Sequence, residues 1–257
     1  MKYLNDVSYK NCVGEVFKSK SSGDFKIVKY NNARNVEIQF LKTGFEMVAQ
    51  LTTIKSGSVK DPYSPSVYGV GVVGIKYLTY EGGRGTKEYK LWCNMLERCY
   101  STTHKKKYPT YEGCEVSDNF KSYEYFYEWC NKQIGSSNES WHLDKDLLIK
   151  GNKVYSESTC VFIPSEINLL LVKNTASRGK HLIGVSWSNT NKSFVAQVKK
   201  NKGKREHLGS FKTELEAYKA YKEAKESFIK EQANKWKGQI DERAYYALIN
   251  YQVDITD

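Results

Sequence analysis

The first quarter of the chain alternates apolar and polar residues in the way that is typical of strands. The segments GEVFKSKSSGDFKIVKY and NVEIQF follow a period of two between residues 13 and 54, and turn-forming clusters stand at 21–24 and 31–32. An irregular connection with Gly, Ser and Pro follows from 54 to 74. We therefore expect a small antiparallel β domain with its connecting loop at residues 1–75.

Between residues 86 and 132 the apolar residues recur at helical spacing. The first apolar set is Trp92, Met95, Leu96 and Cys99, and the second is Phe120, Tyr123, Tyr127 and Cys130. This pattern predicts two amphipathic helices, the second with a possible cap at Ser117. The loop expected between them is basic because it contains His104 and Lys105–Lys107. Phosphate contact and an ordinary solvated loop both remain open for it.

A Gly/Ser-rich break, GSSNES, precedes a compact segment at residues 141–171. Its sequence, WHLDKDLLIKGNKVYSESTCVFIPSEINLLL, predicts a hairpin or paired loops. A helix should follow that begins near Pro164, because proline suits the first position of a helix. We place this segment at the end of a helical central domain, residues 76–172, and expect the basic stretch 173–181 to be a linker.

Three short strand patterns come next, GVSW, SFVAQVKK and REHLGSF. A helix is predicted from Thr213 to about Trp236, where Thr213 and Glu216 have capping-box spacing. Its apolar stripe consists of Ala217, Ala220, Tyr221, Ala224 and Phe228. We expect a three-stranded antiparallel sheet packed on one helix at 182–237, then a tail at 238–257 with a short helix. The predicted fold class is α+β, with several domains.

Alternate residues of a strand point to opposite faces of its sheet, which assigns sides to the second and third strands. The inward set of the second strand is Phe194, Ala196 and Val198, and its outward set is Val195, Gln197 and Lys199. The inward set can pack on the small residues of the helix. On the third strand Arg205 and His207 share one face in the same way, while Lys192, Lys200, Lys202 and Lys204 border the turns.

The formal charge of +11 favours a polyanionic partner, because Lys and Arg that neutralise phosphates release condensed counterions. Residues 171–240 contain sixteen Lys and Arg but only six Glu, so most of the excess lies in the carboxy-terminal third. The six Cys include no CxxC pair, and the first ten residues resemble no secretory signal. We expect reduced thiols, with zinc the weaker alternative, in a soluble protein of the cytoplasm and the host nucleoid. No run approaches the roughly 20 apolar residues of a membrane span.

The carboxy-terminal segment resembles the ethylene-response-factor (AP-two) type of DNA-binding domain, in the form common in phage proteins and homing endonucleases. The residues that carry the resemblance are Gly184-Val185, 194–199, 205–213, Glu216-Ala217 and Ala220-Tyr221. The resemblance implies double-stranded DNA as partner and base contacts in the major groove. The expected DNA-binding residues are Trp187, Lys192, Gln197, Lys199, Lys202, Lys204, Arg205 and His207. One departure is that Ser186 and Ser188 stand where plant members have arginines.

The segment 141–171 resembles phage HNH-like proteins. The matching residues are 143–146, Lys150-Gly151-Asn152, Tyr155-Ser156, 159–164 and Ile167-Asn168. The resemblance implies a Mg²⁺-dependent nuclease in which His142, or a water held by Asp144, is the base and Asn152 orients or ligates. Asp146 and Asn168 would bind the metal. However, the expected His-His or Asp-His pair is replaced by Asp144-Lys145-Asp146, so a degenerate unit that positions DNA is the alternative.

Two main hypotheses follow. The first is a phage-type, HNH-like homing endonuclease that binds DNA through the carboxy-terminal sheet and cuts with the central unit. The second is a non-catalytic DNA-binding regulator or host-takeover factor whose other modules bind host or phage proteins. An inhibitor of a host nucleic-acid enzyme is a third possibility, which keeps the basic surface but not sequence recognition.

Overall fold

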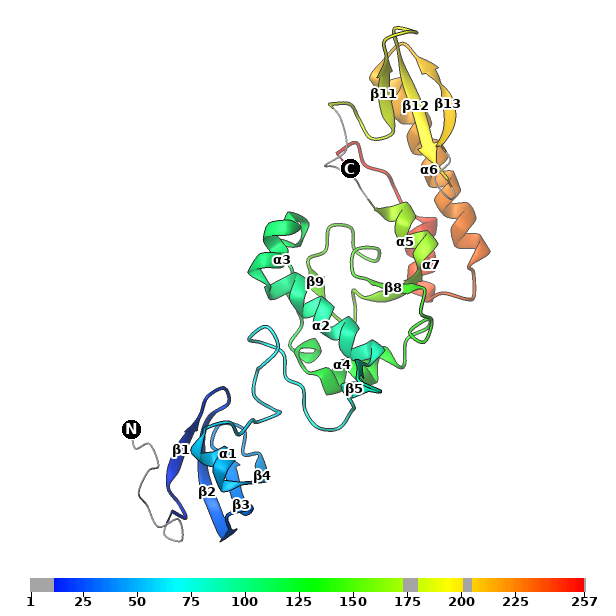
Figure 1. Ribbon diagram of the computed structural model, residues 1–257. Coiled ribbons are helices and arrows are strands. Elements are labelled where there is room, and N and C mark those ends of the chain that lie inside the picture. The colour runs from blue at the N-terminus through cyan, green and yellow to red at the C-terminus, as the bar shows by residue number, and fades with distance from the viewer. Residues whose placement is uncertain (1–11, 173–179, 201–204, 257) are drawn as a thin grey trace. The chain divides into compact units, whose positions relative to one another are not determined.

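The computed structural model describes residues 12–172, 180–200 and 205–256, and the chain divides into two compact units, residues 1–129 and 130–257. Over the described residues it has seven α-helices and several small sheets (Figure 1). The expected mixture of helix and sheet is therefore confirmed. No helix in these ranges combines the length and the apolar character needed to cross a membrane.

The first unit begins with a four-stranded antiparallel sheet in the order β1-β2-β3-β4. Its strands are β1 (Val16–Ser19), β2 (Gly23–Asn32), β3 (Asn35–Phe40) and β4 (Glu46–Ala49). The buried face carries Phe25 and Phe40, whose ring centroids lie 5.7 Å apart. The expected amino-terminal sheet is confirmed. One short segment inside the expected strand region is helical instead, namely α1 (Leu51–Lys55), which buries Leu51 and Ile54 against the same core.

The rest of the first unit has three α-helices, short strands and irregular connections. Its elements are the β5 (Tyr80–Glu81) and β6 (Arg84–Gly85) hairpin, α2 (Lys87–Tyr100), α3 (Thr102–Lys107), β7 (Glu115–Val116) and α4 (Tyr123–Cys130). The α2 helix buries all four apolar residues that the spacing selected, so this prediction is confirmed. The second helix begins later than expected. The Ser117 hydroxyl accepts from the Phe120 amide at 3.4 Å, but the 3-10 helix there has Asp118 at its N-cap position, and α4 starts only at Tyr123.

The prediction of a basic loop between the two helices is wrong, because His104 and Lys105–Lys107 belong to the helix α3. The Ser101 hydroxyl caps this helix by accepting from the His104 amide at 3.2 Å. The segment contains neither Gly nor Pro, and lysine is a good helix former, so one capped turn is favourable once a neighbouring structure supports it.

The second unit contains a hairpin and a sheet with one long helix. Its elements are β8 (Trp141–Asp144), β9 (Val154–Tyr155), β10 (Val161–Pro164), α5 (Ser165–Leu171), β11 (Val185–Ser188), β12 (Ser193–Lys199), β13 (Arg205–Phe211), α6 (Glu214–Lys235) and α7 (Glu242–Ile249). Strands β8 and β10 are antiparallel, and α5 contacts both. Of the hairpin or paired loops that the sequence left open, the structure has the antiparallel pair β8 and β10, with β9 in the long loop between them, and we call this pair the hairpin. The helix after Pro164, the three-stranded sheet and the last two helices are also present.

Candidate nucleic-acid interface

The long helix α6 packs on one face of the carboxy-terminal sheet. Both halves of the predicted capping box are present, since the Thr213 hydroxyl accepts from the Glu216 amide and the Glu216 carboxylate accepts from the Thr213 amide. Tyr218 and Tyr221 of this helix pack with Val198 of β12, which is fully buried. Part of the inward face of the sheet is therefore covered by α6. On the opposite face Val195, which alternation assigned to the outward set, is buried.

Four of the predicted DNA-binding residues lie together on that opposite face. In the β12–β13 register Gln197 stands opposite His207, and Lys199 stands opposite Arg205. Directly opposed residues of antiparallel strands point to the same side of the sheet. Lys199, Arg205 and His207 are exposed and Gln197 is half-buried. We call Gln197, Lys199, Arg205 and His207 the four-residue array.

A β-bulge beside the array decides which residues of β13 point outward. Ala196 pairs with Gly209 and Gln197 pairs with His207, so Leu208 is an extra residue on β13. Leu208 packs into the core against α6, and Gly209 takes a φ of +139°. Without the bulge, the residues on one side of it would have the opposite orientation. Sequence alternation missed this feature, although a glycine inside a strand pattern can indicate a bulge.

The other predicted DNA-binding residues lie away from the array or outside the described residues. Trp187 pairs with Phe194 and their rings are 4.9 Å apart, which puts Trp187 on the opposite side of the sheet from the array. Lys192 is exposed in the β11–β12 turn, with a φ of 45°. Lys202 and Lys204 lie outside the described residues.

The array face is positively charged without acidic side chains of its own. Glu206 is the one acidic residue in β11, β12 and β13, and it pairs in register with Val198 on the inward side. Its carboxylate is neutralised there by Lys200 at 2.7 Å. A polyanion that approached the outward face would meet Lys199 and Arg205 with no opposing carboxylate from these strands.

The hairpin of the second unit brings two of the predicted nuclease residues together. His142 on β8 and Asn168 on α5 make a hydrogen bond of 2.8 Å in which the Asn168 amide donates to His142 Nδ1. With the Asn168 amide in this orientation, Nδ1 is the acceptor of the hydrogen bond. For His142 to act as a base through Nε2, Asn168 would have to turn its carbonyl oxygen toward a protonated Nδ1.

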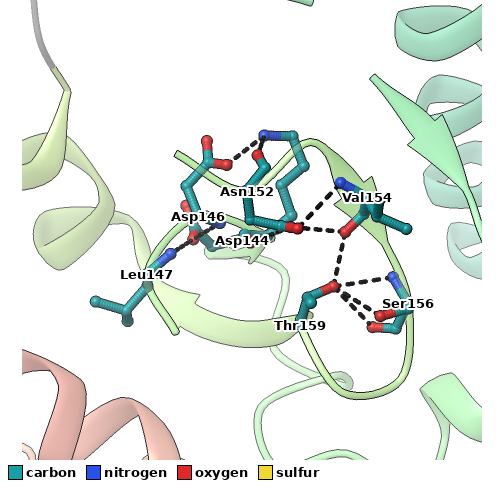
Figure 2. A network of polar contacts seen from close by, with 8 residues as sticks. Asp144, Asp146, Leu147, Asn152, Val154, Ser156 and Thr159 are labelled. Carbon is teal, nitrogen blue, oxygen red and sulfur yellow. Dashed lines mark hydrogen bonds and ion pairs between the residues drawn. The ribbon is translucent and has the colours of Figure 1, made fainter. Parts of the chain in front are cut away.

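Asp144 and Asn152 hold the hairpin loop together (Figure 2). One Asp144 oxygen accepts from the amides of Asp146 (2.8 Å) and Leu147 (2.7 Å). Burial raises the pKa of Asp144, and these two amide bonds oppose the shift. The Asn152 amide donates to the carbonyls of Lys145 (2.8 Å) and Val154 (2.7 Å). Asp144 and Asn152, two of the three predicted catalytic residues, therefore have hydrogen-bond partners that stabilise the loop.

Lys145, to which the sequence assigned no role, lies at the centre of this loop. Its side chain is only 7% exposed, and its ammonium donates to the Asp146 carboxylate and to the Asn152 carbonyl at 2.9 Å. The Tyr155 ring lies 5.7 Å from the same ammonium. A buried charge requires such partners, because a lysine in an apolar setting without them is costly. The LDKD motif alone could not show that Lys145 is buried while Asp146 is exposed.

The donor set does not suit the Mg²⁺ ion that an HNH-like unit implies. Mg²⁺ requires several oxygen ligands in near-octahedral geometry, but Asp146 is already bound to the Lys145 ammonium, which would repel a second cation. No hydrogen bond joins Asp146 to Asn168 in the part of the chain that the structure describes. In the same part, no three His, Cys, Asp or Glu side chains form a metal-ligand group. Asp146 and Asn168 thus remain predicted ligands that the structure does not bring together.

The chain was compared with protein-family models, with curated proteins and with solved structures, and none of them matches it.

Proposed function

We propose that this protein binds double-stranded DNA through the outward face of β11, β12 and β13. The four-residue array carries the proposal, because the strand register gathers Gln197, Lys199, Arg205 and His207 on one face, and three of these four side chains are exposed. A narrow sheet can enter the major groove, where Arg and Lys bind guanine and Gln binds adenine. The ethylene-response-factor type of domain, predicted at 182–237, is the class of module that we assign to this sheet and helix.

The hairpin is best explained as an HNH-like unit in origin whose catalytic motif is degenerate. Its strand, strand and helix order supports that origin, and the Lys145–Asp146 pair supports the loss of a metal site. We infer a protein of phage or mobile-element type, which would act on the nucleoid in the cytoplasm of its host. The competing function is a homing endonuclease that still cuts, for which the His142–Asn168 contact is the favourable observation.

DNA binding can be tested with the whole chain and a labelled random-sequence duplex, by fluorescence anisotropy over a series of salt concentrations. We expect Lys199→Ala and Arg205→Ala each to weaken binding roughly fivefold or more, and to lower the salt dependence by about one released counterion. The matched control is Lys230→Ala, which removes an exposed charge from α6. No binding at low salt, or equal losses in all three variants, would overturn the proposal.

A plasmid-nicking assay with Mg²⁺ or Mn²⁺ distinguishes a degenerate hairpin unit from an active endonuclease. A degenerate unit predicts that wild type, His142→Ala and Asp146→Ala give the same background. Nicking by wild type that requires the metal and disappears in His142→Ala would instead establish the endonuclease and refute degeneracy. Asp144→Ala and Asn152→Ala are unsuitable variants, because both side chains hold the loop.

A further inference from the structure

A second basic surface lies in the first unit, on the helix α3. Lys106, Lys107 and Tyr108 are exposed, with Tyr108 43% exposed, and Lys105 is half-buried. We call Lys105, Lys106, Lys107 and Tyr108 the α3 patch. The Lys107 ammonium lies 5.3 Å from the centre of the Tyr108 ring, so cation and aromatic surface adjoin.

Aromatic contacts of His104 hold the helix that carries the α3 patch in place. The His104 ring packs on Tyr108 at 4.8 Å and on Tyr111 at 5.4 Å. The Arg98 guanidinium of α2 in turn lies 5.6 Å from the Tyr111 ring. These contacts attach α3 to α2, and the lysines that follow His104 are therefore presented by a supported helix rather than by a loose loop.

The lysines of the α3 patch have no acidic partner in the described part of the chain. Among the described residues, none of the three lies within ion-pair distance of a carboxylate. The acidic group closest to this helix in the described contacts is Glu97, which lies 4.0 Å from His104 Nδ1 rather than beside a lysine. Three adjacent cations without counter-charges repel one another, and an external anion relieves that repulsion.

We propose that the α3 patch is a second DNA contact, one that binds backbone phosphates without regard to sequence. This inference rests on the proposed DNA-binding function and extends it to the first unit. Compact ammonium groups suit phosphate oxygens, and an exposed tyrosine beside them can contact sugar or phosphate. A membrane surface is the less suitable partner, because the helix TTHKKK has no apolar residue to insert between lipids.

The test compares two triple variants of the whole chain on a random-sequence duplex. Lys105, Lys106 and Lys107 are changed to Gln in one, and Lys18, Lys42 and Lys60 in the other. The control residues are exposed cations of the same unit outside α3. We expect the first variant to lose about two to three units of the slope of log K against log salt, since each phosphate contact contributes about 0.9. The control should lose less than about one.

Different outcomes separate this inference from the proposed function. If the wild type binds DNA, Arg205→Ala weakens binding and the two triple variants have equal slopes, only the α3 patch is refuted. If the wild type does not bind DNA at low salt, the proposed function fails as well. Binding to phosphatidylserine vesicles that the α3 variant alone abolishes would also overturn the proposal, in favour of a membrane partner. Circular dichroism spectra of both variants should match the wild type, because glutamine, like lysine, is a good helix former.

Discussion

Two buried or half-buried lysines of the second unit, Lys145 and Lys225, differ in whether a partner compensates their charge. Lys145 is buried with a carboxylate and a carbonyl as partners, so its charge is compensated. Lys225 on α6 is half-buried, and no ion pair joins it to any described residue. Burial lowers the pKa of Lys225 to about 8, and the charge of Lys199 adds to the shift. Such a residue stabilises the fold less when it is charged than when it is neutral.

The stability of the protein should therefore depend on pH through Lys225. The folded pKa is about 8 and the ordinary value is 10.5, so between these pH values the unfolded chain binds more protons and the free energy of unfolding rises with pH. Below pH 8 the folded protein bears the full cost of the charge. We predict that Lys225→Met raises the free energy of unfolding at pH 7 by about 1 kcal/mol, after allowing for solvent screening.

Urea unfolding at pH 7 and at pH 10 measures this effect. The gain from Lys225→Met should shrink at the higher pH, where the native lysine is neutral in the folded state. Lys230→Met, at an exposed position of the same helix, should change stability little at either pH. A gain that stayed constant with pH would mean that packing, not charge, produced it.

At the scale of elements, the approach of β11 to α6 depends on one glycine. Gly184 has a φ of +76°, and a Cβ there would lie 2.0 Å from the Tyr221 ring. We predict that Gly184→Ala lowers the free energy of unfolding by about 2–4 kcal/mol, because it adds both backbone strain and overlap with the ring.

Gly151→Ala is the matched control in the same denaturation experiment. Gly151 has a φ of +79° but open space around its missing Cβ, so its substitution introduces strain alone. It should cost about 1 kcal/mol. Equal losses at the two positions would show that contact with Tyr221 does not restrict the position of β11.

At the scale of the whole second unit, contacts at the end of α6 join the hairpin to the carboxy-terminal sheet. Glu166 of α5 accepts from Trp236 Nε1 at 2.7 Å and from the Lys235 ammonium at 3.2 Å. The Trp236 ring packs edge-on against Trp141 of β8 at 5.7 Å. A helix that supports the sheet at one end and the hairpin at the other makes their folding interdependent.

Trp236→Ala tests this coupling. We predict that it lowers the free energy of opening of β8 and β10 by about 2 kcal/mol, which corresponds to roughly thirtyfold faster amide exchange there. Strand β12 packs on Tyr218 and Tyr221 of α6, not on the end of the helix that carries Trp236. Its amides should therefore keep their protection against exchange. Trp187→Ala is the control, because Trp187 packs on Phe194 of the sheet. If both variants left exchange in β8 unchanged, α6 would not couple the two parts.

Local patterns predicted most elements of this protein, for reasons seen at particular residues. Trp92, Met95 and Leu96 could be recognised as one helix face because spacing along the chain fixes their direction. The capping box of α6 was visible because both of its partners are local. The helix α3 was missed, since its support comes from aromatic rings that the helical period does not include.

The sequence by itself determined that β12 is a strand, that a long capped helix follows the sheet and that positive charge is in excess. Only the tertiary structure decided which charges are free to act. The register and the Leu208 bulge bring the exposed Lys199 and Arg205 side by side on the same face of the sheet. The hairpin turns Lys145 inward onto Asp146, where a metal ion was expected. Pairing and burial depend on contacts between distant segments, and neither composition nor spacing along the chain specifies those contacts.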